Sequence, residues 1–232
     1  MDEIEIVKSQ IVRPATIFET GGFKPNNGIA ESWIGKVYVF KEDEGIPLDK
    51  KGKQMIPLIQ LNLTQVEIKP DSISDTKIIT VFISENFPVE LTPNGENWLI
   101  REYDSYDELA IKNIEFESDF IKPFPLKSQR INEDYPVWHG GGLSDEIEDK
   151  ILELEESEVI ESYYDITKNQ YGHKVGGHPS YCQSGINWGS DFEFVLQIAS
   201  DEKANLNIVD SGTIFLAKKV QTKQWKYYCD FY

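Results

Sequence analysis

Seven short stretches of the chain are rich in β-branched and aromatic residues, and most are bounded by Gly, Pro, Asn or Asp. This pattern is typical of β-strands separated by turns. We therefore predict strands at 36–40, 55–63, 77–84, 97–103, 191–200, 212–220 and 224–232. Strand alternation and residue type also predict buried side chains at Cys182, Leu196, Phe215, Trp225 and Cys229.

Helical periodicity is scarcer than strand periodicity. Within 144–164, Ile147, Ile151 and Leu154 recur at spacings of four and three, which predicts one amphipathic helix. A second, shorter helix is predicted in 105–114, "SYDELAIKNI", with Ser105 as its N-cap.

The segment 116–142 holds three prolines, and each one biases the residue before it toward extended backbone. We predict that it is neither a helix nor a central strand, but an extended bridge across the surface. The chain would then be a single domain, 1–232, made of approximate halves 1–103 and 165–232 that are joined by an extended and helical bridge, 104–164.

The two predicted halves resemble one another. Each contains a strand of the form x-L-x-Q-[LI]-x, with Gln60 and Gln197 in matching positions, followed by a polar loop and a second apolar strand. This repetition favours an internal duplication. A buried glutamine needs hydrogen-bond partners, so we expect both amides to bind neighbouring backbone rather than to take part in catalysis. The expected fold class is α+β, with mostly antiparallel β-sheets in two similar halves and one or two short helices.

Acidic residues outnumber basic ones by 40 to 23, which gives a net charge of −17. Nine acids and a single base, Lys150, lie between positions 145 and 161. Such a face repels nucleic acid and attracts a basic protein, although the same charge also serves plain solubility. The candidate partner-binding residues are Glu148, Asp149, Glu153, Glu155 and Glu156.

The first residues, "MDEIEIVKSQ", lack the basic stretch and apolar run of a signal peptide. No later apolar run approaches the roughly 18 residues of a membrane span. We therefore expect a cytoplasmic protein with no membrane partner, whose two cysteines are reduced thiols.

Two histidines and a cysteine, His173, His178 and Cys182, gather in a segment rich in Gly and Pro. The spacing places the histidines on opposite faces of a strand, and only one further histidine, His139, is available to complete a metal site. "HGGG" at 139–142 would need a G-x-S-x-G nucleophile turn to form a hydrolase site, and the sequence has none. We interpret the histidine segment as a turn and assign no catalytic, cofactor or metal residue.

An ordered set of motifs resembles the YwqG-like family, a bacterial family of domains of unknown function. The motifs are "IREYDSYDEL", "FPLKSQRINEDYPVW", "HKVGGHPSYCQS", "FEFVLQIASDE", "SGTIFLAKK" and "YYCDFY". The family's Trp-Gly-Asp-x-Gly loop is reduced here to Asp210 and Gly212. The resemblance spans roughly residues 30–232 and implies an α+β, mostly antiparallel fold. It brings no activity, so no catalytic residue is carried over.

Three classes of function stay open. We expect a non-enzymatic interaction module whose acidic surface binds a basic protein, for example a toxin that it neutralises. A hydrolase or metal-dependent enzyme would use a groove between the halves, with His173, His178, Asp201 and Asp210 as candidate residues. A small-ligand module would instead form a pocket beside the aromatic C-terminal strand.

Overall fold

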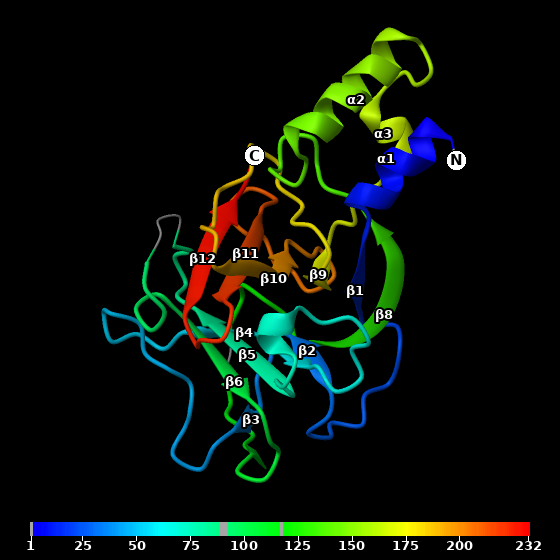
Figure 1. Cartoon of the computed structure of the whole chain (residues 1–232). Helices are drawn as coiled ribbons and strands as arrows, with labels where there is room; N and C mark the ends of the chain where they lie inside the picture. Colours follow the sequence, from blue (N-terminus) through cyan, green and yellow to red (C-terminus); the bar gives the residue numbers. More distant parts are fainter. Residues whose placement is uncertain (1, 89–91, 117) are drawn as a thin grey trace.

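The computed structural model describes residues 2–88, 92–116 and 118–232. Its main feature is a ten-stranded antiparallel sheet (Figure 1). The strands of this sheet are β1 (Arg13–Thr20), β2 (Ser32–Ile34), β4 (Ile56–Asn62), β5 (Ile78–Ile83), β6 (Trp98–Tyr103), β8 (Phe124–Asp134), β9 (His173–Gly176), β10 (Phe192–Ala199), β11 (Thr213–Lys219) and β12 (Trp225–Asp230). Their order across the sheet is β12-β11-β10-β9-β1-β8-β2-β4-β5-β6.

The remaining elements lie outside this sheet. A two-stranded sheet joins β3 (Val39–Phe40) to β7 (Ala110–Ile111), and a single 3-10 turn, η1, covers Asp71–Ile73. Three helices, α1 (Glu3–Ile11), α2 (Asp145–Glu156) and α3 (Tyr163–Ile166), stand together beyond one end of the large sheet (Figure 1). None of the helices in the described ranges is long and apolar enough to cross a membrane.

The two sides of the large sheet are arranged alike around the central pair β1 and β8. Outward from β8 run β2, β4, β5 and β6, and outward from β1 run β9, β10, β11 and β12. Both β4 and β10 carry a register irregularity just before the glutamine, between Pro57 and Ile59 in β4 and between Phe194 and Leu196 in β10. A glycine in the left-handed region stands at the end of each inner strand. Gly35, at φ 71°, directly follows β2, and Gly176, at φ 72°, is the last residue of β9.

The sheet is strongly curved, so that its edge strands β6 and β12 approach each other. Trp98 of β6 stacks on Tyr227 of β12 with ring centroids 5.4 Å apart. The Trp225 indole N–H donates to Glu102 at 2.8 Å, and the Lys218 ammonium binds the same carboxylate. One apolar cluster inside the curve contains residues of both sides of the sheet. We call the contacts around Glu102 the edge seam.

The seven strands predicted from the sequence are confirmed, with the first one shortened to β3. The predicted helix at 105–114 is wrong, because this segment forms a turn and then the two-residue strand β7, which pairs with β3. The helix predicted within 144–164 is confirmed as α2, which buries Ile147, Ile151 and Leu154. The burial prediction fails only for Cys182, which is half-buried.

The prediction of a surface bridge at 116–142 is also wrong. Its residues 124–134 form β8, which pairs with β1 on one side and β2 on the other at the centre of the sheet. Pro123 and Pro136 lie outside the strand, and Pro125 lies near its start, where a missing N–H is tolerated. Because most of β8 is polar, it gave no apolar pattern to find. The strand β1, from the predicted first half, borders β9 of the second.

The three helices share a small apolar core of their own, separate from the core inside the sheet. It is formed by Val7, Ile11, Tyr135, Ile147, Ile151, Leu154, Ile160 and Tyr163. In α1, Val7 and Ile11 are four residues apart and therefore lie on one helical face. We refer to α1, α2 and α3 together as the helical cap.

Candidate functional site

The four residues predicted to form a groove are not brought together. His173 lies on β9 and contacts Asp201, whereas His178 lies beyond the end of β9 in a different environment. Asp210 is exposed in the turn before β11. The four residues therefore occupy three separate places: His173 and Asp201 form a buried pair, His178 lies beside a pocket, and the Asp210 carboxylate is in solvent.

The His173 and Asp201 side chains are 3.2 Å apart and mostly buried. The Ala199 N–H donates to His173 Nδ1, so the proton is on Nε2, which donates to Asp201. Burial opposes ionisation of the Asp201 carboxyl, but hydrogen bonds from His173, Thr20 and the Ala204 N–H outweigh it and hold its pKa well below the usual range. With every polar atom engaged, this pair holds the start of the 201–206 turn against β1.

A fully buried ion pair, not predicted from the sequence, lies behind the glycine-rich turn. Lys174 Nζ is 2.9 Å from Asp134 Oδ2, and neither side chain is exposed. The Asp134 carboxylate also accepts hydrogen bonds from the backbone N–H groups of Gln170 and His178. Burial lowers the pKa of Lys174, and the attraction of Asp134 opposes that effect.

This ion pair explains why the turn contains Gly177. A Cβ at position 177 would lie 2.2 Å from Asp134 Oδ2 and 2.8 Å from the Ala15 Cβ, and the φ of Gly177 is 68°. Both the close approach and the left-handed backbone require glycine. The "GGHP" motif is thus a turn that wraps a buried carboxylate.

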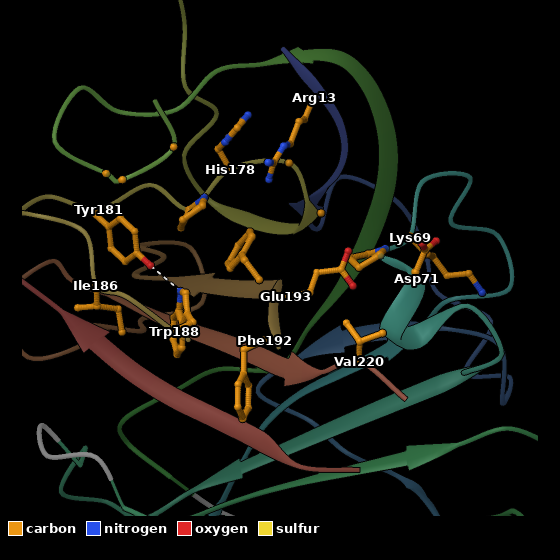
Figure 2. A pocket seen from close by; sticks show the side chains of 18 of the residues that line it. Arg13, Lys69, Asp71, His178, Tyr181, Ile186, Trp188, Phe192, Glu193 and Val220 are labelled. Carbon is orange, nitrogen blue, oxygen red and sulfur yellow. Dashed lines mark hydrogen bonds between the residues drawn. The ribbon is translucent and has the colours of Figure 1, made fainter. Parts of the chain in front are cut away.

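A pocket of about 670 Å³ opens beside this turn (Figure 2). Its lining joins the two glycine motifs, 140–142 and 176–177, to the loop 68–71 and the segment 186–194. His178 and Arg13 lie on one side of the pocket, and the aromatic side chains Tyr181, Trp188 and Phe192 lie on another (Figure 2). Neither Arg13 nor the aromatic wall was singled out from the sequence.

His178 is almost completely buried, and its Nε2 lies 2.8 Å from the Ile11 carbonyl oxygen. Burial, together with the nearby charge of Arg13, lowers the pKa of His178 to about 3. The imidazole is therefore neutral near pH 7. Because a carbonyl oxygen can only accept, the proton is on Nε2 and Nδ1 carries a lone pair.

The cysteines do not have the properties of nucleophiles. Burial, the hydrogen bond to Asp230 and the charge of Asp230 raise the pKa of Cys182 to about 11. Burial raises the pKa of Cys229 to about 11 as well. Both are therefore thiols at neutral pH, whereas catalysis needs the thiolate. Across the described ranges there is also no group of three or more His, Cys, Asp or Glu side chains that could hold a metal ion.

The predicted acidic face lies on α2. Asp149, Glu153 and Glu156 are exposed, and Glu148 and Glu155 are half-buried. Glu155 accepts a hydrogen bond from the Tyr163 N–H, so it has a structural role within the cap.

A groove of about 470 Å³ lies between α1 and α2, beside this acidic face. It is lined by the apolar side chains of Ile6, Val7 and Leu154 and by the charged side chains of Glu3, Lys150 and Glu153. Ile6 is 37 % exposed, so the groove presents an apolar surface to solvent.

The fold and its sites define a class of protein: a curved antiparallel sheet with a helical cap, a pocket beside the glycine-rich turn and a groove within the cap. The model of a family described as domain of unknown function, DUF1963, matches residues 32–227. The chain belongs to this family. A comparison with curated proteins found no match. The predicted membership of a family of unknown function is thus confirmed. The match leaves out β1, ends within β12 and covers the other strands of the large sheet.

Proposed function

We propose that the protein acts by binding, not by turnover, and that the helical cap docks a basic amphipathic segment of a partner protein. The observation that carries the proposal is the groove between α1 and α2, whose lining combines apolar side chains with carboxylates. Ile6 offers exposed apolar contact above the buried Val7 and Leu154. Glu3 and Glu153 offer negative charge, and the one base of the lining, Lys150, is paired with Glu146. A partner helix with apolar residues on one face and lysine or arginine beside them matches both features.

Charge supports the same occupant. The cap contains most of the acids between 145 and 161, together with Glu3 and Glu5 of α1, in a chain of net charge −17. A field of this sign speeds encounter with a cation and repels nucleic acid. A basic toxin neutralised by this chain would be one partner of the required chemistry.

The finer classification belongs to the same proposal. We infer that the chain is a YwqG-like, bacterial, cytoplasmic member of its family. We infer too that the two sides of the sheet descend from a duplicated unit, because the matching glutamines, register irregularities and glycines recur on both sides.

A synthetic peptide of about five helical turns, with leucine on one face and lysine on the other, tests the cap directly. We expect binding by the intact protein that weakens as salt is raised from low to high concentration. Two control peptides, one with lysine replaced by glutamate and one with leucine replaced by serine, should not bind.

A pair of matched variants localises the binding. Glu3→Gln combined with Glu153→Gln should weaken the peptide several-fold, because two carboxylates at the groove border are lost. Glu42→Gln combined with Asp43→Asn removes two exposed charges near β3, at the opposite end of the molecule, and should have no effect. Equal effects of the two pairs, or binding that is insensitive to salt, would reject the cap as the docking surface. A pull-down from cell lysate at low and high salt would then identify the natural partner.

A further inference from the structure

The pocket beside the glycine-rich turn is independent of the groove in the helical cap. Its volume of about 670 Å³ lies within the range of small-molecule sites, roughly 300–1,000 Å³. It is lined by side chains of three different chemistries, which together restrict the ligand: a neutral imidazole, a guanidinium and an aromatic wall.

The imidazole of His178 presents an unused acceptor. Its Nε2 donates to the Ile11 carbonyl, and its Nδ1 makes no hydrogen bond with any residue in the described ranges. A Cβ at Gly142, which also lines the pocket, would lie 3.2 Å from this Nδ1, so the glycine leaves the space beside it open. The lone pair on this Nδ1 accepts from a hydrogen-bond donor, N–H or O–H, of a ligand in the pocket.

The guanidinium of Arg13 presents unused donors. Arg13 is exposed at the start of β1, and within the described part of the chain it forms neither an ion pair nor a side-chain hydrogen bond. Most other basic side chains of this acidic protein form an ion pair or a hydrogen bond. Lys69, which lines the same pocket, donates to the Ser74 carbonyl. A guanidinium pairs with a carboxylate through two parallel hydrogen bonds.

The acidic side chains of the pocket restrict the charge of the ligand that it can bind. Asp71, Asp191 and Glu193 also line it, and they would repel a phosphate dianion. They favour a ligand that carries a positive charge beside a single negative one. Asp191 pairs with Lys219 and Glu193 accepts from the Ser72 N–H, so Asp71 is the carboxylate left unpaired among the described contacts.

The aromatic wall favours a flat apolar group. Trp188 donates from its indole N–H to the Tyr181 hydroxyl at 2.9 Å, which fixes both rings (Figure 2). Phe192 and Phe194 extend the same wall. Rings held in this way stack on an aromatic ligand with little further loss of conformational freedom.

We propose that this pocket binds an aromatic 2-amino carboxylate, with its carboxylate on the Arg13 guanidinium, its ammonium donating to His178 Nδ1 and its ring against Trp188 and Phe192. The ligand is a zwitterion, so the net charge of the protein does not repel it.

Calorimetric titration of the intact protein with L-tryptophan and L-phenylalanine tests the assignment. Three further probes each lack one feature: tryptamine lacks the carboxylate, indole-3-propionate lacks the amine, and L-alanine lacks the ring. We expect the complete ligands to bind and each incomplete one to bind at least tenfold more weakly. No heat from the complete ligands at concentrations on the order of 10 mM, well above a Kd of about 1 mM, would overturn the proposal.

Variants locate the binding without depending on the buried histidine. Arg13→Ala should lower the affinity for L-tryptophan at least tenfold. Arg130→Ala, an exposed arginine on β8 outside the pocket, makes the same change of charge and should have no effect. Equal effects of the two variants would overturn the assignment, as would tighter binding of phenyl phosphate than of L-tryptophan.

His178→Gln keeps a donor toward the Ile11 carbonyl but removes the Nδ1 acceptor. If this variant does not fold, the comparison of L-tryptophan with indole-3-propionate still measures the contribution of the ammonium group.

Discussion

Lys174 of β9 and Asp134 at the end of β8 form an ion pair across β1, with 2.9 Å between Nζ and Oδ2 and no exposure of either side chain. Lys174 also donates to the Gln170 carbonyl, and Asp134 accepts from two backbone N–H groups. The charges are therefore compensated inside the protein, as burial requires. The pair joins the two sides of the sheet at their boundary.

Removing one partner of this pair should be strongly destabilising. Lys174→Met leaves a buried carboxylate without its counter-charge, and we expect a loss of about 3–5 kcal/mol in the free energy of unfolding, measured by urea denaturation. The double variant Lys174→Met with Asp134→Asn should lose less than the sum of the two single variants, because no buried charge is left alone. Strictly additive losses would mean that the two side chains do not act as a pair.

The buried His178 should make stability depend on pH. Its pKa is lowered from 6.5 to about 3 in the folded state, so the unfolded chain binds a proton that the folded chain does not between these values. Stability from this residue is present above pH 6.5 and is lost as the pH falls toward 3. Between pH 7 and pH 5 the free energy of unfolding should fall by about 2 kcal/mol on this account.

Denaturation curves at the two pH values measure the effect. His178→Gln should abolish this part of the pH dependence, whereas His139→Gln, at an exposed position, should retain it. The Asp201 carboxylate acts in a different window: its lowered pKa contributes stability that is lost only below about pH 4, its ordinary range. A pH dependence unchanged by His178→Gln would contradict the neutral, buried imidazole.

The edge seam should control how readily the sheet opens. Glu102 of β6 accepts a hydrogen bond from the Trp225 indole of β12 and binds the Lys218 ammonium of β11. Both contacts link β6 to the other side of the sheet. Glu102→Ala leaves the buried Lys218 ammonium with only the Ser72 carbonyl and no counter-charge, and it leaves the Trp225 indole N–H without a partner; we expect a loss of about 2–4 kcal/mol. Amide hydrogen exchange should accelerate first in β6 and β12.

A control substitution shows whether the effect of Glu102→Ala comes from the edge seam or from the loss of any carboxylate. Glu108→Ala removes a carboxylate whose side chain is 73 % exposed and whose ion pair with Lys41 lies at the surface. We expect no measurable change in stability or exchange from this variant. Faster exchange confined to other strands in Glu102→Ala would show that the seam does not close the sheet.

The parts of the fold predictable from sequence were those with a strong apolar pattern. The strands β4, β5, β10, β11 and β12 are largely buried, and their β-branched and aromatic residues made them visible. The roles of the matching glutamines were also predicted. Gln60 accepts from the Tyr38 and Val39 N–H groups, and Gln197 accepts from the Ser180 N–H, so both bind backbone.

The central strands were missed for a physical reason. In β8 the sequence "KSQRINED" is mostly polar, and its place in the sheet depends on pairing with β1 and β2, which are distant along the chain. The pocket was missed in the same way. Arg13 is separated from His178 by most of the sequence, and only the tertiary fold places them beside one cavity. The turn at "HGGG" was predicted correctly, whereas the histidine segment interpreted as a turn also contains the strand β9, which ends at Gly176. Nothing local indicated that these two glycine motifs line one pocket.

The position of β1 has a consequence for synthesis on the ribosome. Its last residue, Thr20, and the first residue of its neighbour β9, His173, are 153 positions apart, yet the two strands are hydrogen-bonded. The hairpins β4-β5-β6 can pair as soon as they emerge, because they are adjacent in sequence. One edge of β1 stays unpaired until the final quarter of the chain is made, and an unpaired edge invites association with other chains. Nascent chains that stall between β8 and β9 therefore carry an open β1 edge that favours aggregation.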